Sequence, residues 1–150
     1  MSDIDKSVTR ILDTYTSTVY ARDVESFMRL YDPNVRVFDA WGVWSYQGAP
    51  AWQIAVEGWF TSLGSERVKV SFAEVQSAGG PDMAMVSAIV SYAAVSADGV
   101  PLREMHNRIS WVLRTSKHVL RIVHEHTSAP IGFDDMKAIL LRTAPGKDTP

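Results

Sequence analysis

One acidic residue in the first third of the chain has a setting suited to acid–base chemistry. Asp39 belongs to an alternating stretch in which Val35, Val37 and Trp41 share its face. A carboxylate among apolar side chains is either paired or raised in pKa, and a raised pKa near the working pH suits a general acid or base. The other interpretation is an ordinary carboxylate at a strand end, solvated or capping the turn at Gly42. Spacing alone leaves both open.

The histidines form a second group of candidates, because all four fall between residues 106 and 126. Alternation predicts that His124 and His126 share the covered face of the last strand, and that Arg121, Glu125 and Thr127 share its solvent face. An imidazole on the covered face can relay protons or anchor a ligand. At least one of the two is also explained as a core histidine bonded to a backbone carbonyl.

Three further types of side chain are candidates for binding or chemistry. Arg108 either points inward, where its permanent charge requires Asp39 or an anionic ligand, or outward as ordinary sheet surface. Tyr15 is the tyrosine whose hydroxyl is best placed for chemistry. Trp41 and Trp59 are candidates for the pocket wall, although tryptophans of this kind also fill cores and dimer faces.

The composition excludes several classes of function. The 150 residues carry 15 Lys+Arg against 17 Asp+Glu, which gives no bulk attraction to nucleic acid or anionic lipid. The absence of cysteine excludes disulfides, thiolate metal sites and a thiol nucleophile. Asp39, His124 and His126 offer a two-histidine, one-carboxylate ligand set for a metal, but no helical metal-binding spacing supports it. We expect a cytoplasmic protein with no metal, no cofactor, no membrane span and a small-molecule ligand.

The periodicity predicts an α+β domain over residues 1–142, with a short C-terminal extension from about 132 and a disordered tail at 143–150. The extension is expected to form a short covering helix at 133–141, and residues 32–34 a turn. Helices on one face of a curved sheet leave a pocket between the layers. The predicted helices span 4–19, 24–31 and 50–63, and the predicted strands 35–41, 67–77, 83–95, 103–114 and 119–128.

Two segments carry a resemblance to a known superfamily. The segment from Tyr15 to Asp39 parallels, without a gap, the ketosteroid isomerase segment from its oxyanion-hole tyrosine to its base aspartate. Residues 108–114 and 121–130 look like the "R-x-T…W-x-I-V-H-x-H-x-S-x-P" ending of the SnoaL-like branch and of the calcium/calmodulin-dependent kinase association domain. Over residues 4–132 the chain therefore resembles the superfamily of nuclear transport factor two, ketosteroid isomerase and the SnoaL-like cyclases.

The resemblance implies a cystatin-like conical barrel: three N-terminal helices packed on a strongly curved antiparallel sheet, an internal pocket and a homodimer formed through the sheet. It gives Tyr15 the role of hydrogen-bond donor to an enolate and Asp39 the role of base. The second acid of ketosteroid isomerase, a case known in detail, would fall near Ile109 or Ser110. No carboxylate lies between Glu104 and Glu125.

Another group must therefore polarise the carbonyl, and the candidates are Arg108, His124 and His126. The predicted function is a cofactor-independent isomerase, cyclase or dehydratase that removes a proton next to the carbonyl of a cyclic or polyketide-like substrate. The alternative is a non-catalytic ligand-binding or oligomerisation module. The predicted catalytic residues are Asp39, Tyr15 and His126, and the predicted ligand contacts are Arg108, His124, Trp41, Trp59 and Ser110.

Overall fold

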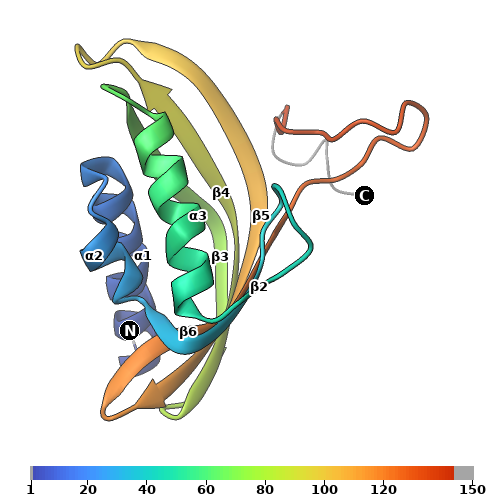
Figure 1. Cartoon of the computed structure of the whole chain (residues 1–150). Coiled ribbons are helices and arrows are strands. Elements are labelled where there is room, and N and C mark those ends of the chain that lie inside the picture. Colours follow the sequence, from blue (N-terminus) through green and yellow to red (C-terminus); the bar gives the residue numbers. More distant parts are fainter. Residues whose placement is uncertain (1, 144–150) are drawn as a thin grey trace.

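A computed structural model describes residues 2–143 of the chain, so the predicted tail at 143–150 lies, apart from Thr143, outside the described residues. The helices and strands follow the predicted order, with one short additional strand, Tyr46–Gln47, that the sequence did not predict (Figure 1). The helices are α1 (Asp3–Ala21), α2 (Val24–Met28) and α3 (Ala49–Ser62). The strands are β1 (Tyr31–Phe38), β2 (Tyr46–Gln47), β3 (Arg67–Gly79), β4 (Met83–Val95), β5 (Pro101–Ser116) and β6 (Val119–Ser128).

The strands of residues 2–143 form one curved sheet in the order β2-β1-β6-β5-β4-β3, and the three helices cover its concave face (Figure 1). The predicted α+β architecture is confirmed. The sheet does not close, since β2 and β3 remain its two edges. β1 runs parallel to β6, whereas the other neighbouring strands are antiparallel as predicted.

The start of α1 is fixed by a capping box, in which the Ser2 hydroxyl accepts from the Asp5 backbone and the Asp5 carboxylate accepts from the Ser2 backbone. Its buried stripe includes Ile11, Tyr15 and Val19, as the apolar spacing predicts. The Asp23 side chain caps α2 by accepting from the Ser26 backbone. These short-range signals place Tyr15 on the helix face that meets the sheet.

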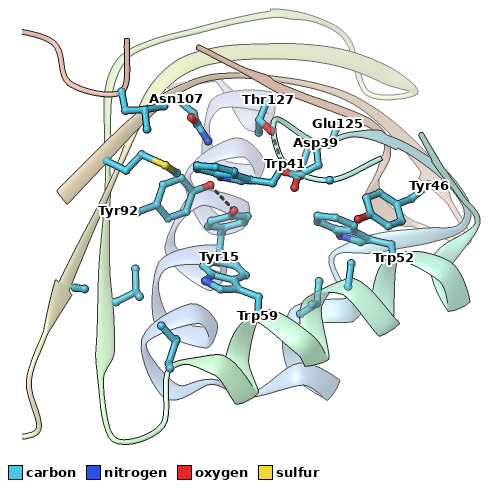
Figure 2. A pocket seen from close by; sticks show the side chains of 18 of the residues that line it. Tyr15, Asp39, Trp41, Tyr46, Trp52, Trp59, Tyr92, Asn107, Glu125 and Thr127 are labelled. Atoms are coloured by element: carbon cyan, nitrogen blue, oxygen red, sulfur yellow. Dashed lines mark hydrogen bonds between the residues drawn. The ribbon is translucent and has the colours of Figure 1, made fainter. Parts of the chain in front are cut away.

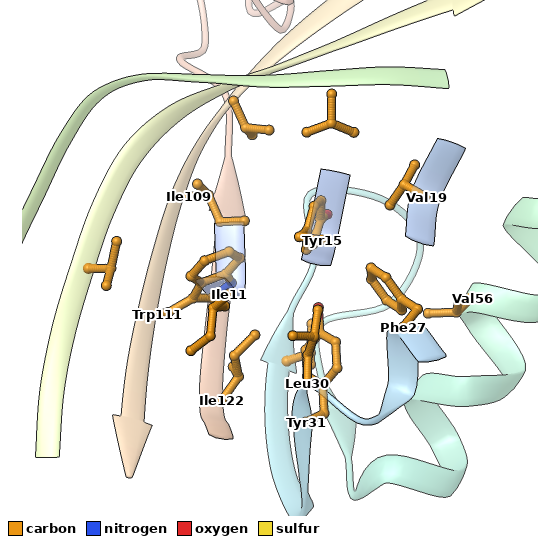
Figure 3. Packing of buried hydrophobic residues seen from close by; sticks show 14 of the residues in the cluster. Ile11, Tyr15, Val19, Phe27, Leu30, Tyr31, Val56, Ile109, Trp111 and Ile122 are labelled. Atoms are coloured by element: carbon orange, nitrogen blue, oxygen red, sulfur yellow. The ribbon is translucent and has the colours of Figure 1, made fainter. Parts of the chain in front are cut away.

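An aromatic core fills one end of the space between helices and sheet (Figure 3). The Tyr15 ring packs against the rings of Phe27 and Trp111, with centroids 5.1 and 5.6 Å away. Phe27, Trp111 and Ile122 are almost completely buried. Because close-packed interiors hold side chains in one arrangement, this core fixes where the Tyr15 hydroxyl points.

An irregularity in β6 changes the orientation of its second half. Leu113 of β5 pairs with Ile122, but Val112 pairs with His124, so Val123 is the extra residue of a β-bulge. Ile122 and Glu125, three positions apart, consequently both face the concave side and are both buried. Before the bulge the predicted alternation holds, and after it every side chain of the strand lies on the opposite face.

Two other predicted features differ in the structure. Residues 32–34 do not end a helix in a free turn but lie inside β1, where the chain bulges between the paired residues Tyr31 and Arg36. The predicted covering helix at 133–141 is wrong. Residues 131–142, which we call the C-terminal strap, form a turn joined by an Ile131–Ala138 bridge instead.

The strap extends the sheet where β6 ends. Ser128, the last residue of β6, pairs with Arg108, so residues 101–107 of β5 have no partner from β6. The His106 backbone N–H donates to Leu140 O (2.7 Å), and the Arg142 backbone N–H donates to His106 Nδ1 (2.9 Å). The strap thereby covers part of an otherwise open strand edge. Of the helices within residues 2–143, none has the length and apolar character needed to cross a bilayer.

Candidate active site

A cavity of about 670 Å³ lies between α1, α3 and the concave face of the sheet (Figure 2). Its size matches typical small-molecule sites. Most of its wall is aromatic or aliphatic, and a few polar groups project into it. The aromatic residues of the wall are Tyr15, Trp41, Tyr46, Trp52, Trp59 and Tyr92.

Asp39 lines this cavity at the point where β1 ends, and Thr127 of β6 holds its carboxylate. The Thr127 hydroxyl donates to Asp39 Oδ1 (3.0 Å) and accepts from the Ala40 backbone N–H (2.9 Å). Burial raises the pKa of Asp39 above its usual value, against hydrogen bonds from Thr127 and from the backbone of Trp41 and Ala40. The result is an oriented carboxylate that is more basic than an exposed aspartate.

Two tyrosines share a hydrogen bond on another side of the cavity. The hydroxyls of Tyr15 and Tyr92 are 2.8 Å apart (Figure 2). Burial and the nearby carboxyl of Glu125 raise the pKa of both phenols, so both keep their protons at neutral pH. One proton is used within the pair. The other hydroxyl proton is therefore available to a ligand oxygen in the cavity.

Glu125 is a second acid on the cavity wall, and only 1% of its surface is exposed. Its Oε1 accepts from Tyr31 Oη (2.6 Å) and from Trp111 Nε1 (2.8 Å). Burial raises the pKa of Glu125 to about 7, against those two hydrogen bonds, and the charge of Asp39 contributes to the rise. The site thus holds two acids in different environments, which is a common basis for dividing acid and base roles.

Four of the predicted site residues line the cavity: Asp39, Tyr15, Trp41 and Trp59. Trp41 is 55% exposed, so it lies at the cavity mouth, whereas Trp59 packs edge-on against the Tyr92 ring at 5.9 Å. Asp39 and Tyr15 thus reach one space from β1 and α1. This shared cavity was expected from the sequence.

The predicted orientation of His124 and His126 is wrong. The bulge at Val123 turns both side chains to the convex face, where their rings lie 5.0 and 5.5 Å from Phe38. His124 Nδ1 is 2.8 Å from Arg36 O. Neither imidazole lines the cavity, so the polarising role predicted for His126 and the ligand contact predicted for His124 have no geometric basis there.

Arg108 and Ser110 also point away from the cavity. Both are exposed on the convex face, because they alternate along β5 with the buried residues Ile109 and Trp111. Arg108 Nε donates to Ser128 Oγ (3.0 Å). The ligand contacts predicted for Arg108 and Ser110 are therefore not formed at this cavity. For Arg108 the structure selects the outward of the two directions that the sequence allows.

The polar cavity residues that sequence reasoning missed are Glu125, Thr127, Tyr92 and Asn107. Alternation predicts the solvent face for Glu125 and Thr127, since nothing in the composition of β6 marks the bulge. Asn107 had a readable signal: it stands in alternation with Ile109 and Trp111, which places a polar residue on the apolar face of β5.

A metal site is not formed by the described part of the chain. Within residues 2–143 no three His, Cys, Asp or Glu side chains come together as ligands would. Asp39 lies on the concave face and the two histidines considered with it lie on the convex face.

Comparison with solved structures supports the fold. A nuclear transport factor 2-like protein of unknown function from Pseudomonas putida KT2440 is 18% identical, with a TM-score of 0.82 over 96% of this chain and 99% of that one. A provisionally named scytalone dehydratase from Novosphingobium aromaticivorans is 10% identical, with a TM-score of 0.71 over 83% and 82% of the two chains. At such identities the likeness concerns the fold.

A third similar structure is a provisionally named calcium/calmodulin-dependent protein kinase II association domain from Xanthomonas campestris, which is 14% identical with a TM-score of 0.70 over 82% and 85% of the chains. Among curated proteins, none matches the sequence. The model of the SnoaL-like domain matches residues 8–132, which include α1 from its sixth residue, every later element to β6, and both Asp39 and Tyr15. This chain belongs to the SnoaL-like family.

Proposed function

We propose that this protein binds a cyclic ketone or polyketide-like ring in the cavity and moves a proton next to its carbonyl without a cofactor. The observation that carries the proposal is the arrangement of Asp39, oriented by Thr127, on the same cavity as the Tyr15–Tyr92 pair. A base and a hydrogen-bond donor facing one apolar space are the two groups that enolisation requires.

In the proposed step, an Asp39 oxygen takes the proton from the carbon next to the carbonyl. The C–H electron pair becomes the C=C bond of the enolate, and the carbonyl π pair moves onto oxygen. The free hydroxyl proton of the Tyr15–Tyr92 pair hydrogen-bonds that oxygen as its charge grows. Where a C=C bond is conjugated with the enolate, return of the proton from Asp39 to the γ-carbon gives an isomer. Where the substrate carries a β-hydroxyl, transfer of that proton to the hydroxyl lets it leave as water, and the enolate electron pair forms the new C=C bond of the dehydration product.

The environment of the cavity supports this step. Its aromatic walls favour ring ligands, and their low polarity strengthens the hydrogen bond to the enolate. Because the raised pKa of Asp39 makes it a stronger base than an exposed carboxylate, proton removal becomes less unfavourable.

Hydrogen exchange at the α-carbon tests the proposal without knowledge of the natural substrate. The probe is 2-tetralone in D₂O, with deuterium uptake followed by NMR. Wild-type protein is expected to exceed buffer exchange, and Asp39→Asn to lose about 100-fold or more of that rate, as removal of a general base does. Asp39→Asn should still bind 2-naphthol, a planar analogue of the tetralone enol, as measured by fluorescence.

Asp98→Asn provides the matched control, because it makes the same change at an exposed turn residue. It should exchange like wild type. Exchange by Asp39→Asn at the wild-type rate would remove the base assignment. Tight 2-naphthol binding with no exchange by wild type would favour the alternative, a ligand-binding module of the same fold.

We further propose a homodimer formed through the convex face of the sheet, as the family resemblance implies. That face carries an aromatic cluster of Phe38, His124 and His126, and the Arg36 guanidinium lies 4.7 Å above the Phe38 ring. Surface clusters of aromatic residues and arginine are typical of protein interfaces.

A further inference from the structure

Two residues that line the cavity each have a buried polar atom without a hydrogen-bond partner among residues 2–143: Trp52 Nε1, a donor, and Asn107 Oδ1, an acceptor. Asn107 lies on the concave face of β5 and is only 5% exposed. Its Oδ1 accepts no hydrogen bond from any described residue, although the side chain lines the cavity (Figure 2). Buried polar atoms in native proteins nearly always have a partner, so an unpartnered amide oxygen at a ligand cavity indicates a group that the ligand supplies.

The residues around Asn107 are apolar, which supports a role in ligand binding. Its neighbours on the same face of β5 are Met105 and Ile109, and its partner on β4 is Val90. An apolar residue would fit this position and avoid the cost of burying an unpaired acceptor. A polar side chain at a position that suits an apolar one is expected mainly at functional sites.

The register places Asn107 away from the proposed base. Asp39 follows Phe38, which pairs with His126 of β6, and Thr127 of β6 pairs with Ile109 of β5. Asp39 and Asn107 are therefore separated by two strand intervals, about 10 Å across the sheet, and by roughly 7 Å along β5 from Ile109. A ring ligand that reaches both needs polar groups at opposite ends.

Resting on the proposed function, we propose that Asn107 recognises a hydroxyl group on the substrate ring, at the end remote from the carbonyl, and that the substrate class is hydroxylated cyclic ketones. The amide oxygen accepts the hydroxyl proton. A neutral hydroxyl fits better than an ammonium group, because Met105, Ile109 and Val90 offer neither a charge nor an acceptor to a cation.

Paired probes that differ only in one O–H group test the proposal by binding alone. The pairs are 2,6-dihydroxynaphthalene with 6-methoxy-2-naphthol, and 2,7-dihydroxynaphthalene with 7-methoxy-2-naphthol, titrated by fluorescence. Each methoxy partner keeps the ring but cannot donate from that position. Wild-type protein is expected to bind the dihydroxy member of at least one pair about tenfold or more tighter.

Asn107→Leu keeps the approximate side-chain volume and removes the acceptor. We expect it to lose the preference for the dihydroxy probe while its affinity for 2-naphthol stays within about threefold of wild type. Asn34→Leu, the same change at an exposed residue outside the cavity, should keep the preference. The 2-naphthol titration also shows that the variant retains a folded cavity.

Three results would overturn the inference: equal affinities within both pairs for wild type, a preference that persists in Asn107→Leu, or no binding of any probe at millimolar concentration. Failure of the proposed reaction would look different. A preference that depends on Asn107, together with α-exchange that does not depend on Asp39, would leave hydroxyl recognition intact and remove only the base assignment.

Discussion

At the scale of single residues, Glu125 is the side chain whose ionised form burial makes unfavourable. Its carboxyl is buried, and with a pKa of about 7 it binds a proton that the unfolded chain, with an ordinary value near 4.5, releases. Between these two values the folded state holds more protons than the unfolded state. The free energy of unfolding contributed by Glu125 therefore falls as the pH rises from about 4.5 to 7, and changes little above that range.

Glu125→Gln is expected to remove this pH dependence. The amide oxygen of glutamine can still accept from Tyr31 and Trp111, and the neutral side chain has no charge to desolvate. We expect the variant to match wild type near pH 5 and to exceed it at pH 8 by about 1–3 kcal/mol. Urea unfolding at the two pH values measures the difference.

Glu104→Gln serves as the comparison, because Glu104 is exposed and its pKa is lowered by hydrogen bonds from Ser91 and His106. That variant should gain no stability at pH 8. If Glu125→Gln were less stable than wild type at pH 8, the ionised carboxylate would be the form that the fold favours.

At the scale of secondary-structure elements, sequence periodicity predicted what depends on short-range order. The stripe of α1, the Asp23 cap and the bounds of β4 and β6 were all predictable, because caps and alternating side chains act within a few residues. Asp39 and Tyr15 could be placed together for the same reason, combined with the family resemblance.

The part of the site that could not be predicted depends on one extra residue. Val123 forms a bulge only because β6 must pair with β5 and bend with the sheet, and neither partner nor curvature is visible in the local sequence. A single inserted residue reverses the faces of the side chains that follow it. The prediction therefore placed His124 and His126 inward and missed Glu125 and Thr127.

The strap offers an element-scale prediction, because its two neighbouring leucines differ in orientation. Leu140 lines the cavity, whereas Leu141 lies over the outer surface of the sheet. Leu140→Ser removes apolar contact with a ligand and should weaken 2-naphthol binding about three- to tenfold, since each buried methylene is worth about 0.8 kcal/mol. Fluorescence titration measures the change.

Leu141→Ser is the matched control and should bind 2-naphthol like wild type, because Leu141 is 53% exposed. Equal losses in the two variants would mean that the serine change disturbs the strap as a whole. Equal retention would mean that Leu140 borders the cavity without contacting the ring.

At the scale of the whole molecule, the two faces of the sheet have different environments. The concave face is covered by helices and holds the core and the cavity, so every group proposed for catalysis or recognition lies there (Figures 1 and 2). On the convex face, a row of outward residues crosses three neighbouring strands, from Met85 through Val112 to His124. A second chain that buried this row would therefore leave the cavity on the other face open to ligand.

The proposed homodimer therefore predicts that assembly and ligand binding can be separated. The chain has a mass of 16.7 kDa, so light scattering should give about twice that value for wild type. Val112→Lys places an uncompensated charge in the middle of the row and should return the mass to that of one chain. Ile54→Lys, at a 72% exposed position of α3 on the helical side, should remain dimeric. Because the Val112 side chain is outside the cavity, the monomeric variant should still bind 2-naphthol, whereas a monomeric wild type would remove the convex face as an interface.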